Sequence, residues 1–185
     1  MLEIRWHSRA GQGAVTGAKG LADVISTTGK HVQAFAFYGS AKRGAAMTAY
    51  NRVDDKVIMN HEKFMAPDYV LVIDPALLYT TDVTVNHKEN TIYIITTHMN
   101  AQELVASQPK LEGKVIHTID CIKIAQETIG KPIPNTPMLG ALMKISGMYK
   151  IDFFKDNMIR VLGKLPQKII DANMVAIQRA YDEVK

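Results

Sequence analysis

Glu3-Ile4-Arg5-Trp6-His7-Ser8-Arg9 runs directly into Ala10-Gly11-Gln12-Gly13-Ala14-Val15, and this stretch determines the fold that we expect. Apolar and polar side chains alternate from Leu2 to His7, which is typical of a half-buried strand. The glycines indicate a tight loop, and apolar residues then recur at helical spacing until Gly29. The stretch therefore predicts a strand, a glycine loop and the first turn of a helix.

A second short apolar run at 32–37 completes a strand–helix–strand unit. Such a unit implies parallel strands joined by a right-handed crossover. The run is followed by the loop Tyr38-Gly39-Ser40-Ala41-Lys42-Arg43-Gly44. We expect this loop and the glycine loop to lie at the carboxyl ends of neighbouring parallel strands, which is the edge where open α/β sheets bind ligands.

The rest of the chain predicts an α/β protein. Residues 46–53 and 57–59 read as a β-hairpin around a turn at 54–56. Continuous apolar runs, typical of buried parallel strands, lie at 69–73 and 92–95, and a further strand is expected at 115–119. A capping box of Asn100 and Glu103 predicts a helix at 100–107, and a cap at Asp120 predicts the next helix. A third helix is expected after a Thr136 cap, with Pro137 at the first helical position. Two further helices are expected at 151–162 and 166–185. The expected fold is one domain, residues 1–185, with a mostly parallel sheet, helices on both faces, a β-hairpin insertion and a helical C-terminal third.

Composition narrows the class of protein. Lys and Arg are spread along the chain without a basic stripe interleaved with aromatics, so nucleic-acid binding is not expected. No apolar run is long enough to span a bilayer, and no signal peptide is evident. Cys121 is the single cysteine, so it can neither close an intrachain disulfide nor hold a metal or an iron–sulfur cluster alone. A free thiol suits a reducing compartment, and we expect the cytoplasm.

The two loops have the chemistry to bind an anion. Glycines between a strand and a helix let the backbone approach a ligand and leave helix N–H groups pointing outward, which suits a phosphate or pyrophosphate. A tight turn without a ligand is the alternative. NAD held in the usual way is not expected, because residue 16 is threonine and 34–37 contains no carboxylate. The candidate ligand-binding residues are Arg9, Gly11, Gln12, Gly13, Lys42 and Arg43.

The sequence contains few candidates for catalytic groups. His7 closes the first strand, where a structural, hydrogen-bonded histidine is more common than a base. Asp74, before Pro75, reads as a turn or cap residue. The other histidines lack metal-ligand spacing, and no Ser–His–Asp arrangement or Cys-x-x-Cys pair is present. The sequence therefore predicts no catalytic residues and no metal site in this chain.

Nearly the whole chain resembles, in order, the gamma subunit of the 2-oxoacid:ferredoxin oxidoreductases, and of pyruvate:ferredoxin oxidoreductase in particular. The stretches that carry the resemblance are 5–14, 32–39, 42–45, 67–70, 74–75, 134–141, 166–167 and 171–173. This sequence has Ala10 and Ala45 where many relatives carry glycine, which stiffens both loops.

The resemblance implies a non-catalytic subunit that works with alpha, beta and delta-type subunits. Thiamine diphosphate and the iron–sulfur clusters would then be on those partners, and this chain would bind no cofactor alone. The family reaction converts pyruvate and coenzyme A to acetyl-CoA and CO2 with reduction of ferredoxin or flavodoxin. The resemblance also places this domain near the route of coenzyme A, whose phosphates fit the anion-binding loops. A 2-oxoglutarate or branched-chain 2-oxoacid complex and a free-standing nucleotide-binding module remain as alternatives.

Overall fold

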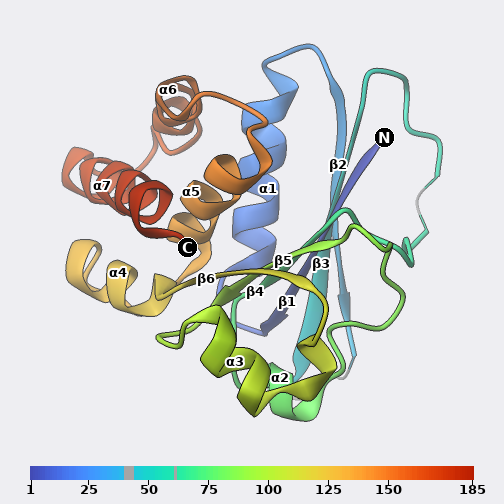
Figure 1. Cartoon of the computed structure of the whole chain (residues 1–185). Coiled ribbons are helices and arrows are strands. Elements are labelled where there is room, and N and C mark those ends of the chain that lie inside the picture. The colour runs from blue at the N-terminus through green and yellow to red at the C-terminus, as the bar shows by residue number, and fades with distance from the viewer. Residues whose placement is uncertain (40–43, 61) are drawn as a thin grey trace.

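A computed structural model describes residues 1–39, 44–60 and 62–185. In that part of the chain, one six-stranded sheet forms the centre of the molecule. Its strands are β1 (Leu2–Arg9), β2 (His31–Tyr38), β3 (Ala46–Asp54), β4 (Tyr69–Val72), β5 (Ile92–Thr96) and β6 (Val115–Ile119). They lie side by side in the order β2-β3-β1-β4-β5-β6 (Figure 1). The pairings of β1 with β4, β4 with β5 and β5 with β6 are parallel, which confirms the mostly parallel sheet.

The prediction of a hairpin between 46–53 and 57–59 is wrong. β3 is antiparallel to both β1 and β2 and lies between them, so its partners are already in place. Residues 57–59 form no strand. The Gln33 side chain donates to the carbonyl of Ile58 at 3.1 Å, and the Arg52 Nη1 donates to the carbonyl of Asn60 at 2.8 Å. These side chains hold the segment against the sheet and take the place of strand pairing.

The first two strands run in the same direction but are not neighbours, which corrects a second expectation. Only residues 39–45 connect β2 to β3. A connection this short can join antiparallel strands, whereas parallel neighbours need a crossover of a dozen or more residues. β3 therefore pairs with β2 first and separates it from β1. The two candidate loops still share one edge of the sheet, because β1 and β2 point the same way.

Helices cover both faces of the sheet, as predicted. One layer contains α1 (Ala14–Ser26), α4 (Cys121–Thr128), α5 (Asn135–Ser146), α6 (Ile151–Val161) and α7 (Gln167–Glu183). The other face carries the shorter α2 (Leu77–Thr80) and α3 (Ala101–Ser107), and Figure 1 shows the two groups on opposite sides. The 3₁₀ turn Pro109–Leu111 follows α3. The helical C-terminal third is confirmed by α4 to α7.

Of the three predicted N-cap residues, two are correct. Asn100 and Glu103 form the complete capping box of α3, and the Asp120 carboxylate accepts from the Lys123 N–H to cap α4. α5 begins one residue before the predicted cap, with Pro134 at the N-cap position. Pro137 fits inside the first turn because backbone N–H groups there have no partner within the helix.

Strand β1 is buried on both faces and not half-buried as predicted. Ile4 and Trp6 face the helical layer and are fully buried. Trp6 Nε1 donates to Asn51 Oδ1 at 2.9 Å, and Asn51 Nδ2 donates to the carbonyl of Ala18 at 2.8 Å, so one amide joins β1, β3 and α1. On the opposite face the Arg5 guanidinium donates to three backbone carbonyls, those of Met65, Val83 and Val85.

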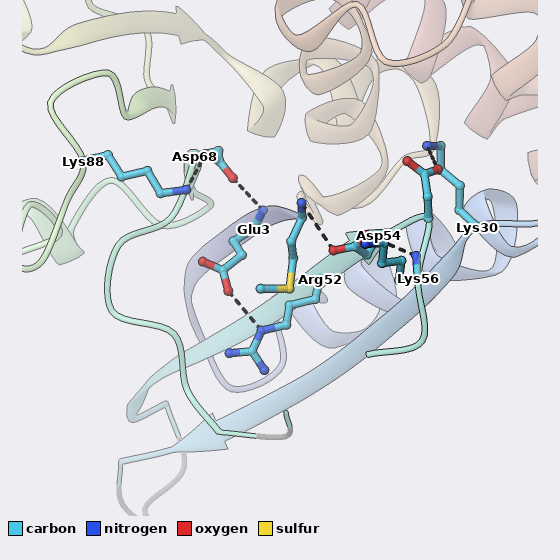
Figure 2. Close-up of polar contacts among 9 residues, drawn as sticks. Glu3, Lys30, Arg52, Asp54, Lys56, Asp68 and Lys88 are labelled. Atoms are coloured by element: carbon cyan, nitrogen blue, oxygen red, sulfur yellow. Dashed lines mark hydrogen bonds and ion pairs between the residues drawn. The ribbon is translucent and has the colours of Figure 1, made fainter. Parts of the chain in front are cut away.

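The start of β1 is held by a chain of polar contacts (Figure 2). The Glu3 carboxylate accepts from Arg52 Nε at 3.0 Å, and the Glu3 backbone N–H donates to Asp68 Oδ2 at 2.8 Å. Lys88 Nζ pairs in turn with Asp68 Oδ1. Arg52 is only 2% exposed, so its ion pair with Glu3 lies inside the protein. These contacts fix the strand whose far end carries the glycine turn.

Within the described ranges, none of the helices combines the length and the apolar character needed to cross a bilayer.

Candidate functional site

The glycine turn, residues 10–13, occupies a favourable place in the sheet. After β1 the chain passes into α1 on one face, and after the neighbouring strand β4 it passes into α2 on the other face (Figure 1). The two connections therefore diverge to opposite faces at the carboxyl edge. This is the kind of switch point where open α/β sheets bind ligands.

The two glycines of the turn have different surroundings. Gly11 has φ +98° and is exposed, and a Cβ placed there would meet nothing within 4 Å. Gly13 has φ +89°, and its Cβ would lie 2.8 Å from Asn135 Nδ2 and 3.2 Å from Ile133 Cγ2. Both therefore need glycine for their backbone conformation. Gly13 is closed off by the α4–α5 connection, whereas Gly11 is open to solvent.

The first turn of α1 has neither a side-chain cap nor an acidic residue. Gly13 is its N-cap residue and supplies no side chain, and no acidic residue lies in the first turn. The positive end of the helix dipole is thus not neutralised from within the helix. Thr16 and Lys19 are exposed. The arrangement suits a phosphate, carboxylate or similar anion resting on the turn.

Arg9 and Gln12 hold the turn in shape. Arg9 Nε and Gln12 Nε2 each donate to Asp74 Oδ2 at 2.9 Å, and Gln12 Oε1 accepts from the Arg9 N–H at 2.8 Å. Asp74 is buried, and its other oxygen accepts from the Ala76 N–H. The carboxylate therefore ties the loop after β1 to the loop after β4. The positive charge of Arg9 is partly compensated by Asp74 and is less available to a ligand than the sequence suggests.

The second candidate loop meets the turn where it is described. The Ala10 N–H donates to the carbonyl of Ala45 at 3.2 Å, and Arg9 Nη1 donates to the carbonyl of Gly44 at 3.1 Å. The structure therefore brings the two loops together. Lys42 and Arg43 lie outside the described residues, so their predicted role stays a prediction.

His7 is buried in β1, two residues before Arg9, and this burial is consistent with a structural role. Its side chain is enclosed on the α2 side of the sheet, and Nε2 has no hydrogen-bond partner within the described chain. Burial, with a smaller contribution from the Arg5 charge, lowers the pKa of His7 to about 3. The neutral imidazole is therefore retained in the folded state at physiological pH.

Acid is expected to destabilise the fold through His7. The unfolded chain binds a proton on this residue below about pH 6.5 and the folded chain does not until about pH 3, so stability falls as pH drops through that window. Between pH 7.5 and 5.0 the loss attributable to His7 is about 2 kcal/mol. Urea unfolding at both pH values measures it. His7→Gln should flatten this dependence, whereas His98→Gln, at an exposed position, should leave it intact. An equal pH dependence in the His7 variant would contradict the assignment.

Metal binding by the described part of the chain would require His, Cys, Asp or Glu side chains that lie close together. No group of three or more His, Cys, Asp or Glu side chains is placed to hold an ion there. Cys121 is fully buried, and desolvation raises the pKa of its thiol. A buried protonated thiol is a poor metal ligand. The chain's cysteine chemistry does not fit an iron–sulfur cluster.

The sequence does not predict that Asp74 and Asn135 belong to the site. Asp74 caps the turn at Ala76, as predicted, and it also binds both Arg9 and Gln12. Its position directly after a buried strand was the signal, because that places it at the carboxyl edge of the sheet. Asn135 packs on Gly13 from more than a hundred residues away, and no local pattern indicates that contact.

Comparison with known proteins gives consistent results along the whole chain. Residues 3–183 match the family of pyruvate ferredoxin/flavodoxin oxidoreductase. The common gamma subunit of the pyruvate/ketoisovalerate oxidoreductases of Thermococcus kodakarensis is 45% identical over 184 residues, which cover 99% of this chain and 97% of the relative. Pyruvate synthase subunit PorC of Thermotoga maritima is 40% identical over 184 residues, covering 99% and 94%.

Solved structures agree with the fold. The crystal structure of pyruvate oxidoreductase subunit PORC from Thermotoga maritima superimposes with a TM-score of 0.85 at 37% identity, covering 100% of this chain and 97% of that one. A 2-oxoglutarate:ferredoxin oxidoreductase from Magnetococcus marinus, with 2-oxoglutarate, coenzyme A and succinyl-CoA bound, contains the same fold. Its TM-score is 0.76 at 17% identity, covering 98% of this chain and 30% of that chain.

Proposed function

The chain belongs to the pyruvate ferredoxin/flavodoxin oxidoreductase family, and we propose that it acts as the non-catalytic gamma subunit of a complex that oxidises pyruvate. In that reaction pyruvate, coenzyme A and two oxidised ferredoxins give acetyl-CoA, CO2, a proton and two reduced ferredoxins, or the equivalent with flavodoxin. Support comes from relatives that carry the gamma or PorC name and match over nearly their full length.

The proposal assigns the redox groups to other chains. The single buried thiol and the absence of a metal-binding cluster in the described residues fit a subunit that holds no iron–sulfur centre. Thiamine diphosphate and the clusters would be bound by the alpha, beta and delta-type partners. The isolated chain should accordingly show no 2-oxoacid-dependent reduction of viologen, and turnover by the isolated chain would refute this part of the proposal.

We also propose that the glycine turn contacts coenzyme A on its way to the catalytic subunit. The observation that carries this is the open Gly11 at the switch point between β1 and β4, beside an uncapped α1 N-terminus. Coenzyme A presents phosphates, which this arrangement favours. Arg9, Gln12 and Asp74 act by holding the turn in its ligand-ready shape, and Gly13 acts by packing the turn on the α4–α5 connection.

Replacing Gly11 with alanine tests the coenzyme A contact. The added Cβ meets no atom, but φ +98° is strained for alanine, so the turn should shift without loss of the fold. In the assembled complex we expect the KM for coenzyme A to rise about tenfold, which corresponds to about 1.4 kcal/mol, while the KM for pyruvate stays unchanged.

The matched control is Gly113→Ala. Gly113 also has a positive φ, +72°, and open surroundings, but lies before β6 at the other end of the strands. It should leave both KM values unchanged. Equal KM values for coenzyme A in the two variants would overturn the role of the turn and leave the assignment to the complex intact.

The 2-oxoacid accepted by the complex is a separate question. A relative that serves pyruvate and ketoisovalerate oxidoreductases in common favours ketoisovalerate as the second candidate substrate. A shared subunit implies that substrate choice is made on another chain. Substrate preference of the assembled complex, measured with pyruvate, ketoisovalerate and 2-oxoglutarate, distinguishes these cases.

A further inference from the structure

The two edge strands of the sheet, β6 and β2, differ in whether another segment pairs with their outer side. At the β6 edge, the backbone of Lys185 pairs with Thr118. The Thr118 N–H donates to the Lys185 carbonyl at 3.0 Å, and the Lys185 N–H donates back at 3.2 Å. The C-terminal residue therefore occupies the outer side of β6. At the opposite edge, β2 has β3 on one side and no strand of the described chain on the other (Figure 1).

The open β2 edge has the properties of a pairing surface. β2 is eight residues long, and from Val32 to Phe37 it contains no charge and no proline. Its residues 32–36 are half-buried, and among the described residues a hollow of about 380 Å³ is lined by 33–37. Natural proteins normally protect such edges with charges, proline, bulges or a covering segment. A long, uncharged edge strand with no further strand beside it in the described residues is a candidate for pairing with a strand of another chain.

Exposed apolar side chains extend the surface beside this edge. Val57 and Met59 are 65% and 82% exposed, and they flank Ile58, whose carbonyl receives the Gln33 side chain. Tyr38, at the end of β2, is 62% exposed. Exposed apolar side chains therefore lie near both ends of the β2 edge, where they could extend a pairing interface. We define the docking surface as the outer edge of β2 together with Tyr38, Val57 and Met59.

We propose that a β-strand of a sister subunit of the oxidoreductase pairs with β2 on this docking surface. The proposal rests on the proposed function, since it requires a multi-subunit complex. Backbone hydrogen bonds along the edge would supply affinity, and alternate side chains would supply specificity. The sister strand should be uncharged over about six residues, with aliphatic side chains toward the α1 layer and apolar ones against Phe35 and Phe37.

A sister subunit is favoured over a second copy by position. β2 ends at the carboxyl edge of the sheet, and the loop that follows it rejoins the glycine turn through the Ala10 and Ala45 backbone contact. A subunit that passes coenzyme A to a catalytic partner needs that partner beside this edge. Charge also favours a sister subunit over a second copy. The chain carries a net charge of +4, and Lys63 lies over the Phe37 ring at the end of β2. An acidic group on the sister subunit, outside the uncharged strand, would complement Lys63, whereas a second copy would add charge of the same sign.

Hydrogen–deuterium exchange tests the pairing directly. The chain alone is compared with the complex assembled from the co-expressed alpha, beta and delta-type subunits. We expect those β2 amides that are not bonded to β3 to exchange at least tenfold more slowly in the complex. The β6 amides, already paired with the C-terminal residue, should change little.

A double variant tests the same surface without touching the core. Val57→Glu with Met59→Glu places charges at exposed positions, so the fold should be unaffected. It should weaken assembly with the sister subunits at least tenfold, as measured by the concentration needed to recover the complex. Val115→Glu is the matched control, because Val115 is also exposed, at 48%, but lies on the β6 edge.

The outcomes are distinguishable. If the wild type assembles but β2 gains no protection and the double variant assembles normally, the docking surface is wrong and the proposed function stands. If the wild type does not assemble with the other subunits at all, both proposals fail. If the chain alone forms a dimer with β2 protected, the occupant is a second copy, and the sister-strand proposal is overturned.

Discussion

Gly140→Ala is expected to destabilise the chain by about 3 kcal/mol or more, although alanine has a higher helix propensity than glycine. Gly140 lies in α5 where that helix crosses α7. A Cβ there would lie 2.1 Å from the Ile177 carbonyl oxygen and 2.9 Å from its carbon. The obstacle is backbone, so the helices must move apart and lose contact around the buried Leu139 and Ala176. Urea unfolding of the isolated chain measures the change.

Gly20→Ala is the matched control for that prediction. Gly20 is also buried within a helix, but its Cβ would meet only the flexible end of Met158, at 3.7 Å. Helix propensity should then dominate, and the variant should be about 0.5–1 kcal/mol more stable than the wild type. The two substitutions are chemically the same and are expected to have opposite signs. If Gly140→Ala also stabilised the chain, the close approach of α5 and α7 would be wrong.

Glu3→Ala is expected to cost about 3 kcal/mol, because it leaves the buried Arg52 guanidinium without its carboxylate. Arg52 retains the Asn60 carbonyl and its contacts over the rings of Phe35 and Phe64. None of those groups carries a compensating negative charge. The substitution also loosens the start of β1 shown in Figure 2, and the loss should be seen in the same unfolding experiment.

The double variant Glu3→Leu with Arg52→Met separates the ion pair from general loss of packing. Replacing both charges with apolar groups of similar size removes the desolvation penalty together with the attraction. We expect the double variant to lie within about 1 kcal/mol of the wild type and well above Glu3→Ala in stability. A double variant as unstable as the single one would show that the Glu3 position matters for another reason.

Much of the fold could be predicted from local patterns. Alternation in 2–7, the continuous apolar runs at 69–73 and 92–95, and helical spacing after Gly13 correctly place most strands and helices. The capping residues Asn100 and Asp120 correctly place two helix starts. These signals are local, because a strand or helix period and a cap depend on residues within a few positions of one another. The glycine turn can be predicted for the same reason, because the positive φ angles of Gly11 and Gly13 require glycine irrespective of the neighbouring segments.

Strand order and the fine structure of the site were decided only by the tertiary structure. Alternation shows that 46–53 is a strand, but not that it inserts between β1 and β2, because pairing depends on edges that distant segments leave open. Arg9 and Gln12 read as ligand-binding groups until the fold places Asp74 between them. By itself the sequence determined which elements form and where the backbone must turn. Which elements become neighbours, and therefore which charges are already neutralised before a ligand arrives, depends on long-range packing that no local period encodes.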